Sequence, residues 1–152
     1  MTMATLSERD WQIRLHIYRH LVDHGRPPTF AETARSFAIP ADDARQAYRR
    51  LHEGHALFLE PSTDAVRMAN PLSAVPTPYR VYVDGRRLWA NCAWDSLGIP
   101  AMLHVDAQIE AVFTPSGDAA TYAITAGHFE AASGVVHFPL PFRQWYDNLI
   151  HT

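Results

Sequence analysis

The single cysteine of this 152-residue chain, Cys92, stands three residues before a carboxylate, Asp95, in an apolar and aromatic segment. If the chain turns helical after Asn91, residues three apart share a helix face, and the thiol and the carboxylate point into one pocket. A thiol is a soft nucleophile and metal ligand, and a carboxyl group can carry a proton. A free cysteine is also among the most buried residue types, and residue chemistry alone favours that structural role.

Two effects of the surroundings should tune this pair. The start of a helix favours the thiolate of Cys92, and the charge of Asp95 opposes it. We expect Cys92 to be accessible from a pocket and somewhat more reactive than a free thiol. Burial near Trp89 and Trp94 would disfavour the charged form of Asp95 and raise its pKa. Both tryptophans are expected in the core, and lining a pocket would give them both roles.

Composition limits the classes of protein to consider. The length fits one compact domain or two small ones, and 47% hydrophobic residues allow a sizeable core. One cysteine excludes an internal disulfide and fits a reducing compartment, and no apolar run reaches transmembrane length. We therefore expect a cytoplasmic protein with no membrane partner. The net charge is −3, and such a mildly acidic chain does not suggest a nucleic-acid binder.

The N-terminal half reads as three helices and a hairpin. Capping boxes at Ser7 and Thr29 mark helix starts, and the first helix carries a broad apolar arc that includes Trp11 and Leu15. The predicted elements are helices over 7–25, 29–36 and 40–54 and strands over 56–59 and 66–68. This order is typical of a winged helix, in which the third helix reads DNA.

The charges of this region argue against DNA binding. The third helix carries Arg45, Arg49 and Arg50, but it begins with Asp42 and Asp43. Nine acidic residues balance nine arginines between residues 7 and 68. Without net positive charge the region lacks the attraction that dominates DNA affinity, so we expect it to be structural and expect no nucleic-acid partner.

The C-terminal half changes to strands after a proline-rich linker. The predicted elements are a hairpin over 79–90, the cysteine helix to about 102, strands over 109–114, 122–125 and 135–138, and a C-terminal helix over 143–150. The sequence thus predicts an α+β protein with a winged-helix-like N-terminal region, 1–69, a linker, 70–78, and a core domain, 79–152, whose mixed or antiparallel sheet carries the cysteine helix.

Histidines offer weaker candidates for chemistry. His16, His20 and His24 are spaced four apart, which permits a metal site on one helix face. No cysteine or acid nearby completes a coordination set, so we expect a solvated face. His137 lies in a predicted strand near the presumed pocket, where it is either a proton donor or a core histidine.

The segment Arg86–Ala101, which reads Arg-Arg-Leu-Trp-Ala-Asn-Cys-Ala-Trp-Asp-Ser-Leu-Gly-Ile-Pro-Ala, resembles the signature of the alkylmercury (organomercurial) lyase family. The order of elements agrees with that family from about residue 9. The resemblance implies that Cys92 is the first catalytic cysteine and Asp95 the catalytic aspartate. The family's second catalytic cysteine is missing, and by spacing Ser133 is the nearest match to it.

The implied reaction explains what that loss means. One thiolate binds R–Hg⁺, a second weakens the Hg–C bond, and a carboxylic acid protonates the carbon. We expect a divergent member that binds organomercury or another soft electrophile at Cys92, with Asp95 as proton carrier and with slow turnover or a need for external thiols. Mercury is then substrate or ligand, and no cofactor is expected. Alternatives are a non-catalytic thiol or soft-metal binding or sensing module, and a winged-helix transcriptional regulator.

Overall fold

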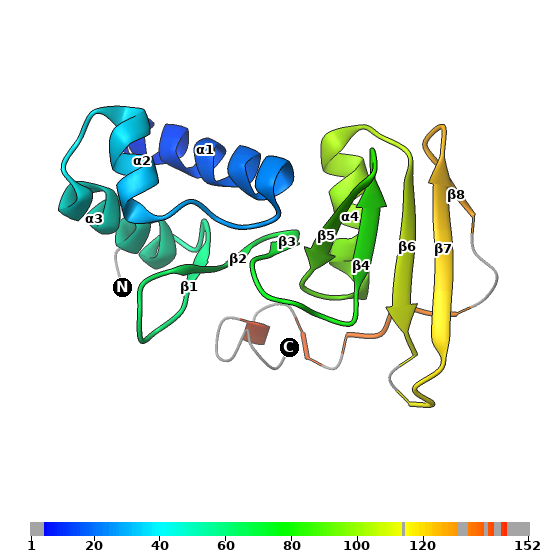
Figure 1. Cartoon of the computed structure of the whole chain (residues 1–152). Coiled ribbons are helices and arrows are strands. Elements are labelled where there is room, and N and C mark those ends of the chain that lie inside the picture. Colours follow the sequence, from blue (N-terminus) through cyan, green and yellow to red (C-terminus); the bar gives the residue numbers. More distant parts are fainter. Residues whose placement is uncertain (1–4, 114, 131–133, 139, 142–143, 146–152) are drawn as a thin grey trace.

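The structure is a computed structural model that describes residues 5–113, 115–130, 134–138, 140–141 and 144–145. Its first three elements are helices, followed by a two-stranded antiparallel pair (Figure 1). Their bounds are α1 Glu8–His24, α2 Phe30–Phe37, α3 Ala41–Glu53, β1 Phe58–Leu59 and β2 Val66–Ala69. The helices predicted from the sequence are confirmed to within a few residues, because the signals that start and stop them are local.

Both predicted capping boxes are present. Ser7 Oγ accepts the Asp10 N–H at 3.2 Å, and the Asp10 carboxylate accepts the Ser7 N–H at 2.9 Å. Thr29 and Glu32 make the same reciprocal pair at the start of α2. These bonds satisfy backbone donors that have no partner inside the helix.

The apolar arc of α1 is narrower than predicted. Ile13, Ile17 and Leu21 are buried in the core, whereas Trp11 and Leu15 are 47% and 48% exposed. The packing of α1 on α3 and the sheet leaves the outer edge of the arc in solvent, which the helical period alone does not reveal.

One sheet of eight strands joins the two halves of the described chain, in the order β1-β2-β3-β5-β4-β6-β7-β8, with every neighbouring pair antiparallel. The remaining strands are β3 Leu72–Ser73, β4 Arg80–Val83, β5 Arg86–Ala90, β6 Ala107–Val112, β7 Ala119–Thr125 and β8 His128–Glu130. The β4–β5 hairpin turns at Asp84 and Gly85, both with positive φ, as the Asp-Gly signal predicts. An α+β architecture with an antiparallel sheet is therefore observed.

The segment 70–78 contributes to this sheet. Leu72 pairs with both Ala69 of β2 and Ala90 of β5, and its side chain is only 1% exposed. Short though it is, β3 makes the sheet continuous across the predicted linker.

Helix α4, Ala93–Leu103, covers one face of the sheet and packs on β4, β5 and β6 (Figure 1). Its buried residues are Ser96, Ile99 and Pro100, and Pro100 is accommodated inside the helix. The helix that was predicted to follow Asn91 is thus present. None of the described helices is both long and apolar enough to cross a membrane.

The C-terminal part differs most from the prediction. Strand β8 was not predicted, and residues 135–138, predicted as a strand, have no regular secondary structure. In Figure 1 the described part of this segment passes behind the lower parts of β7 and β6 and continues towards β1 and β3. Of the predicted C-terminal helix only Gln144 and Trp145 are described, in a 3₁₀ turn.

Candidate active site

Cys92 occupies the N-cap of α4, directly after β5 ends. Its backbone is extended (φ −149°, ψ 179°), and its Sγ accepts the Asp95 N–H at 3.4 Å. Serine, threonine, aspartate and asparagine are the usual N-caps, because an oxygen accepts the free N–H groups of the first turn. Sulfur is a weaker acceptor, so Cys92 caps α4 less well than an oxygen side chain would, and it places a thiol at a helix N-terminus.

Burial outweighs the helix terminus in setting the protonation of this thiol. Burial raises the pKa of Cys92 above its ordinary value of 9.0, the N–H groups of Asp95 and Trp94 oppose the rise, and the charge of Asp95 adds to it. This shift is opposite in direction to the one that would make Cys92 more reactive than a free thiol, and the reactivity itself stays a prediction.

Asp95 lies in the first turn of α4 and is half-buried. Burial raises the pKa of Asp95 above its ordinary value of 3.8, while hydrogen bonds with Asn91 and Cys92 lower it. The upward shift of the Asp95 pKa agrees with the direction predicted from the sequence. The two functional groups also influence each other: Asp95 raises the pKa of the Cys92 thiol, and the thiol lowers the pKa of the acid.

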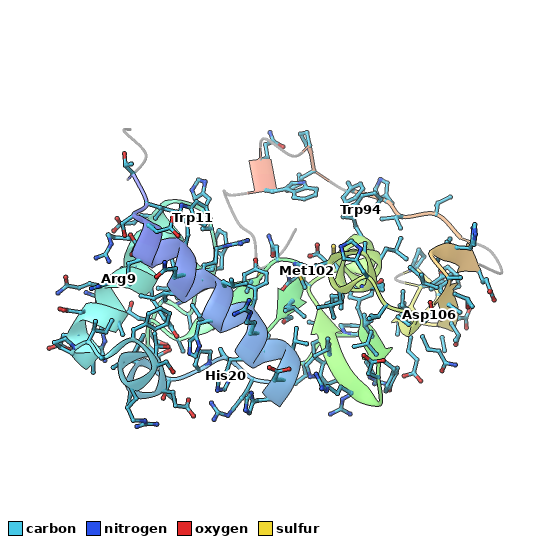
Figure 2. All side chains as sticks on the ribbon, turned by 90° about the horizontal axis from the view of Figure 1, so that it is seen from above. Arg9, Trp11, His20, Trp94, Met102 and Asp106 are labelled. Atoms are coloured by element: carbon cyan, nitrogen blue, oxygen red, sulfur yellow. The ribbon has the colours of Figure 1, made fainter. Side chains whose placement is uncertain are left out.

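The two tryptophans of the motif do not lie in the core. Trp94 is 56% exposed on the outer side of α4, where Figure 2 shows it beside the C-terminal segment. Trp89 is half-buried on β5, with the guanidinium of Arg87 over its ring at 4.7 Å from the centroid. Of the two, Trp94 lines the pocket described below.

An amide connects Asp95 to the N-terminal helices. Asn91 Nδ2 donates to Asp95 Oδ2 at 3.2 Å and to Asn70 Oδ1 at 2.9 Å. The Asn70 carbonyl accepts the Tyr18 hydroxyl at 2.7 Å, and Tyr18 in turn accepts from Arg14 Nη2 at 2.7 Å. Sequence reasoning missed these residues, although a polar Asn91 between an apolar strand and Cys92 was a signal. The Asp95 carboxyl therefore depends on α1 as well as on α4 for its orientation.

Close packing holds α4 against the segment that supplies Asn70. A Cβ at Gly98 would lie 3.2 Å from Pro71 Cβ, so a side chain at this position would push the helix away. The Asn91 N–H also donates to the Pro71 carbonyl at 3.4 Å. These contacts keep Asn70 and Asn91 within hydrogen-bonding distance.

Cys92 and Asp95 both line a pocket of about 500 Å³. Its walls come from β2, from the segment 70–79, from the start of α4 and from the C-terminal segment. The lining residues are Arg67, Met68, Asn70, Ser73, Val75, Pro76, Thr77, Pro78, Tyr79, Asn91, Cys92, Ala93, Trp94, Asp95, Val136, His137, Phe138 and Trp145. A thiol, a carboxyl group and a mostly apolar wall thus share one cavity, as the spacing of the cysteine motif predicted.

The remaining candidates have mixed outcomes. Ser133 lies outside the described residues, so its distance from Cys92 stays untested. His137 lines the pocket and is exposed, which is wrong for a core histidine.

The histidine stripe of α1 forms no metal site. His20 and His24 stack at 4.2 Å between ring centroids, and His16 packs edge-on against Phe37. Within the part of the chain that the structure describes, no group of three or more His, Cys, Asp or Glu residues could hold a metal ion.

Comparison with known proteins identifies a family and a shared fold. A family model described as MerB, alkylmercury lyase, matches residues 72–151. Among solved structures, the "Crystal structure of the mercury-bound form of MerB2" has a TM-score of 0.69 and 21% sequence identity, and the match covers 84% of this chain and 61% of that chain. No curated protein matches. The solved structure shows that the fold is shared, and this chain spans less than two thirds of its length.

Proposed function

Since this chain belongs to the alkylmercury lyase family, we propose that it binds an organomercurial through Cys92 and cleaves its carbon–mercury bond with a proton from Asp95. The observation that carries the proposal is that the thiol of Cys92, which accepts the Asp95 N–H at 3.4 Å, and the Asp95 carboxyl group line one pocket, with the Asp95 pKa raised by burial. The organomercurial is the substrate, and the proposal requires no cofactor.

Cys92 at the N-cap and Asp95 in the first turn of α4 can pass one proton between them and on to the substrate. As mercury bonds to Sγ of Cys92 and loses its previous ligand, the S–H proton passes to the Asp95 carboxylate. Burial favours the neutral acid that results. The acid then donates this proton to the mercury-bound carbon, and the electron pair of the C–Hg bond forms the new C–H bond. The products are R–H, a carboxylate, and Hg²⁺ held by the cysteine thiolate.

The family's reaction uses a second cysteine sulfur, and this chain has only one cysteine. A serine hydroxyl is a hard, protonated and poor mercury ligand. With Ser133 at the matching position, we propose a divergent member in which an external thiol supplies the second sulfur and removes Hg²⁺. Turnover is then slow without added thiol.

In this proposal the chain is divided into residues 1–69, 70–78 and 79–152. The first of these parts has a structural role and does not bind DNA. In a DNA-binding winged helix the arginines of the third helix would contact DNA. Here the three arginines contact other residues of the same chain. Arg49 pairs with Asp64 at 2.6 Å, Arg50 with Asp10 at 2.7 Å, and Arg45 stacks over Phe30. These contacts favour the enzyme over a transcriptional regulator.

A second candidate function is a non-catalytic soft-metal or thiol-sensing module. The observation that favours it is the single cysteine, because one thiolate suffices to hold mercury but not to weaken the Hg–C bond strongly. The two candidates differ in one product, the released hydrocarbon.

Benzene release from phenylmercury tests the proposal. The protein is incubated with phenylmercury and excess small thiol, and benzene is followed by gas chromatography. We expect release above the protein-free rate, loss of both binding and release in Cys92→Ser, and faster release in Ser133→Cys. Stoichiometric binding through Cys92 with no benzene in any of these proteins would contradict the lyase and leave the binding module.

A further inference from the structure

Three of the aromatic side chains that line the pocket containing Cys92 form a chain of ring contacts. Trp94 follows the cysteine by two residues, and Phe138 and Trp145 come from the C-terminal segment. Phe138 lies between the other two, with ring centroids 6.0 Å from Trp94 in an edge-to-face arrangement and 5.3 Å from Trp145 in a stacked one. A pair of segments far apart in sequence thus builds one aromatic wall, defined by Trp94, Phe138 and Trp145.

This wall is not explained by the stability of the fold. Trp94 is 56% and Phe138 42% exposed, so much of their apolar surface faces water. Trp94 belongs to the first turn of α4, whose buried contacts are Ser96, Ile99 and Pro100. In Figure 2 its side chain lies at the outer side of the helix beside the C-terminal segment. Exposed aromatic surface that is gathered in a pocket commonly marks a ligand site.

The rest of the pocket fits an apolar ligand group attached to mercury. Val75, Pro76 and Pro78 add further apolar surface to the lining. Two-coordinate mercury is linear, so the carbon group lies on the side of mercury away from Sγ of Cys92 and extends into the cavity. A methyl group would leave most of the 500 Å³ to water, whereas an aromatic ring can reach the wall.

We infer that this pocket selects arylmercury compounds, with the aryl ring packed against Trp94 and Phe138. The inference rests on the proposed function, because it places the mercury on Cys92. Aromatic rings favour offset-stacked or edge-to-face contacts, and both geometries occur within the wall itself. The protein therefore binds phenylmercury more tightly than methylmercury, relative to the affinities of the two for a small thiol.

Competition binding of phenylmercury and methylmercury against a small thiol tests this inference. In Trp94→Ala we expect the preference for phenylmercury to fall by about ten-fold, the size of one favourable aromatic pair, while methylmercury affinity is unchanged. Phe138→Leu keeps an apolar side chain and removes the ring, and it should reduce the preference in the same direction. The matched control is Trp11→Ala, which removes a similarly exposed tryptophan of α1 that does not line the pocket.

The outcomes separate this inference from the proposed function. If both mercurials bind through Cys92 with no preference beyond that of the small thiol, the inference is overturned and the proposed function is untouched. An equal loss of affinity for both in Trp94→Ala and Phe138→Leu would also overturn it, because the wall would then support only the fold. If the parent protein binds neither compound, the proposed function fails and the inference fails with it.

Discussion

The N-termini of α1 and α4 carry the same spacing and do different things. Ser7 and Asp10 stand at the N-cap and third position of α1, and Cys92 and Asp95 stand at those positions of α4. In both helices the N-cap side chain accepts the N–H of the aspartate, at 3.2 Å from oxygen and 3.4 Å from sulfur. The hydrogen bond from the aspartate N–H to the N-cap side chain is therefore shared, and the difference lies in the groups that contact each carboxylate.

Asp10 is only 1% exposed and is surrounded by donors. Hydrogen bonds from Arg50 and Ser7 hold the pKa of Asp10 below its ordinary value despite burial, which acts in the opposite direction. The carboxylate stays charged and fastens α1 to α3 through Arg50.

Asp95 has an amide and a thiol as its hydrogen-bond partners, and burial raises its pKa. One aspartate is thus a structural anion, and the other is the proton carrier of the proposed reaction. The comparison teaches that the partner from elsewhere in the fold, and not the capping motif, sets the chemistry of a carboxylate at this position.

The largest expected difference between substitutions of the two aspartates is in the rate of benzene release. Asp95→Asn should lower benzene release from phenylmercury by about 10²–10⁴-fold, because it removes the proton donor, and it should leave mercury binding at Cys92 intact. Asp10→Asn should retain the parent rate per folded molecule. Gas chromatography measures benzene release by the two variants, and a parallel titration measures their mercury binding. If Asp95→Asn releases benzene at the parent rate, another group supplies the proton.

The next effect separates them by stability. Asp10→Asn should lower the free energy of unfolding by about 2–3 kcal/mol, because the charged hydrogen bonds to Arg50 and Ser7 are lost. Asp95→Asn should not destabilise the protein at neutral pH, since it removes a charge that burial disfavours. Urea unfolding followed by circular dichroism provides the numbers. Equal destabilisation by both changes would mean that Asp95 is also a structural anion.

The pH dependence of stability should have opposite signs at the two sites. The pKa of Asp10 is lowered on folding, so its contribution is present above the ordinary value of 3.8 and is lost as pH falls through the folded value. The pKa of Asp95 is raised, so the parent is favoured over Asp95→Asn most below 3.8 and loses that advantage as pH rises through the folded value. Unfolding curves of the parent and both variants between pH 3 and 8 measure these contributions. If the contributions of Asp10 and Asp95 change with pH in the same direction, the contrast between the two sites is wrong.

The smallest effect concerns the caps themselves. Cys92→Ser should raise the free energy of unfolding by about 0.5 kcal/mol, because an oxygen caps a helix better than a sulfur, while mercury binding is lost. The reciprocal change, Ser7→Cys, should lower it by about the same amount. Thermal unfolding of the two variants beside the parent is sufficient, and a destabilised Cys92→Ser would assign the thiol a packing role instead.

Local sequence signals were enough to predict α1, α2, α4 and the β4–β5 hairpin. The capping boxes at Ser7 and Thr29, the Asp84-Gly85 turn and the Cys92 motif each act over a few residues, so their elements could be predicted from the sequence. The pairing of Cys92 with Asp95 belongs to this group, because a spacing of three on a helix needs no distant partner.

Distant contacts decided the rest, since they join residues that no sequence period relates. Only the packed structure brings Asn70 and Tyr18 to the hydrogen-bond network of Asp95, gives Arg50 to Asp10, and inserts Leu72 into the sheet. Only the path of the C-terminal segment places Phe138 beside Trp94, which the sequence assigned to the core. Spacing along the chain therefore determined which residues could react, and tertiary packing determined their protonation, their orientation and the wall that faces them.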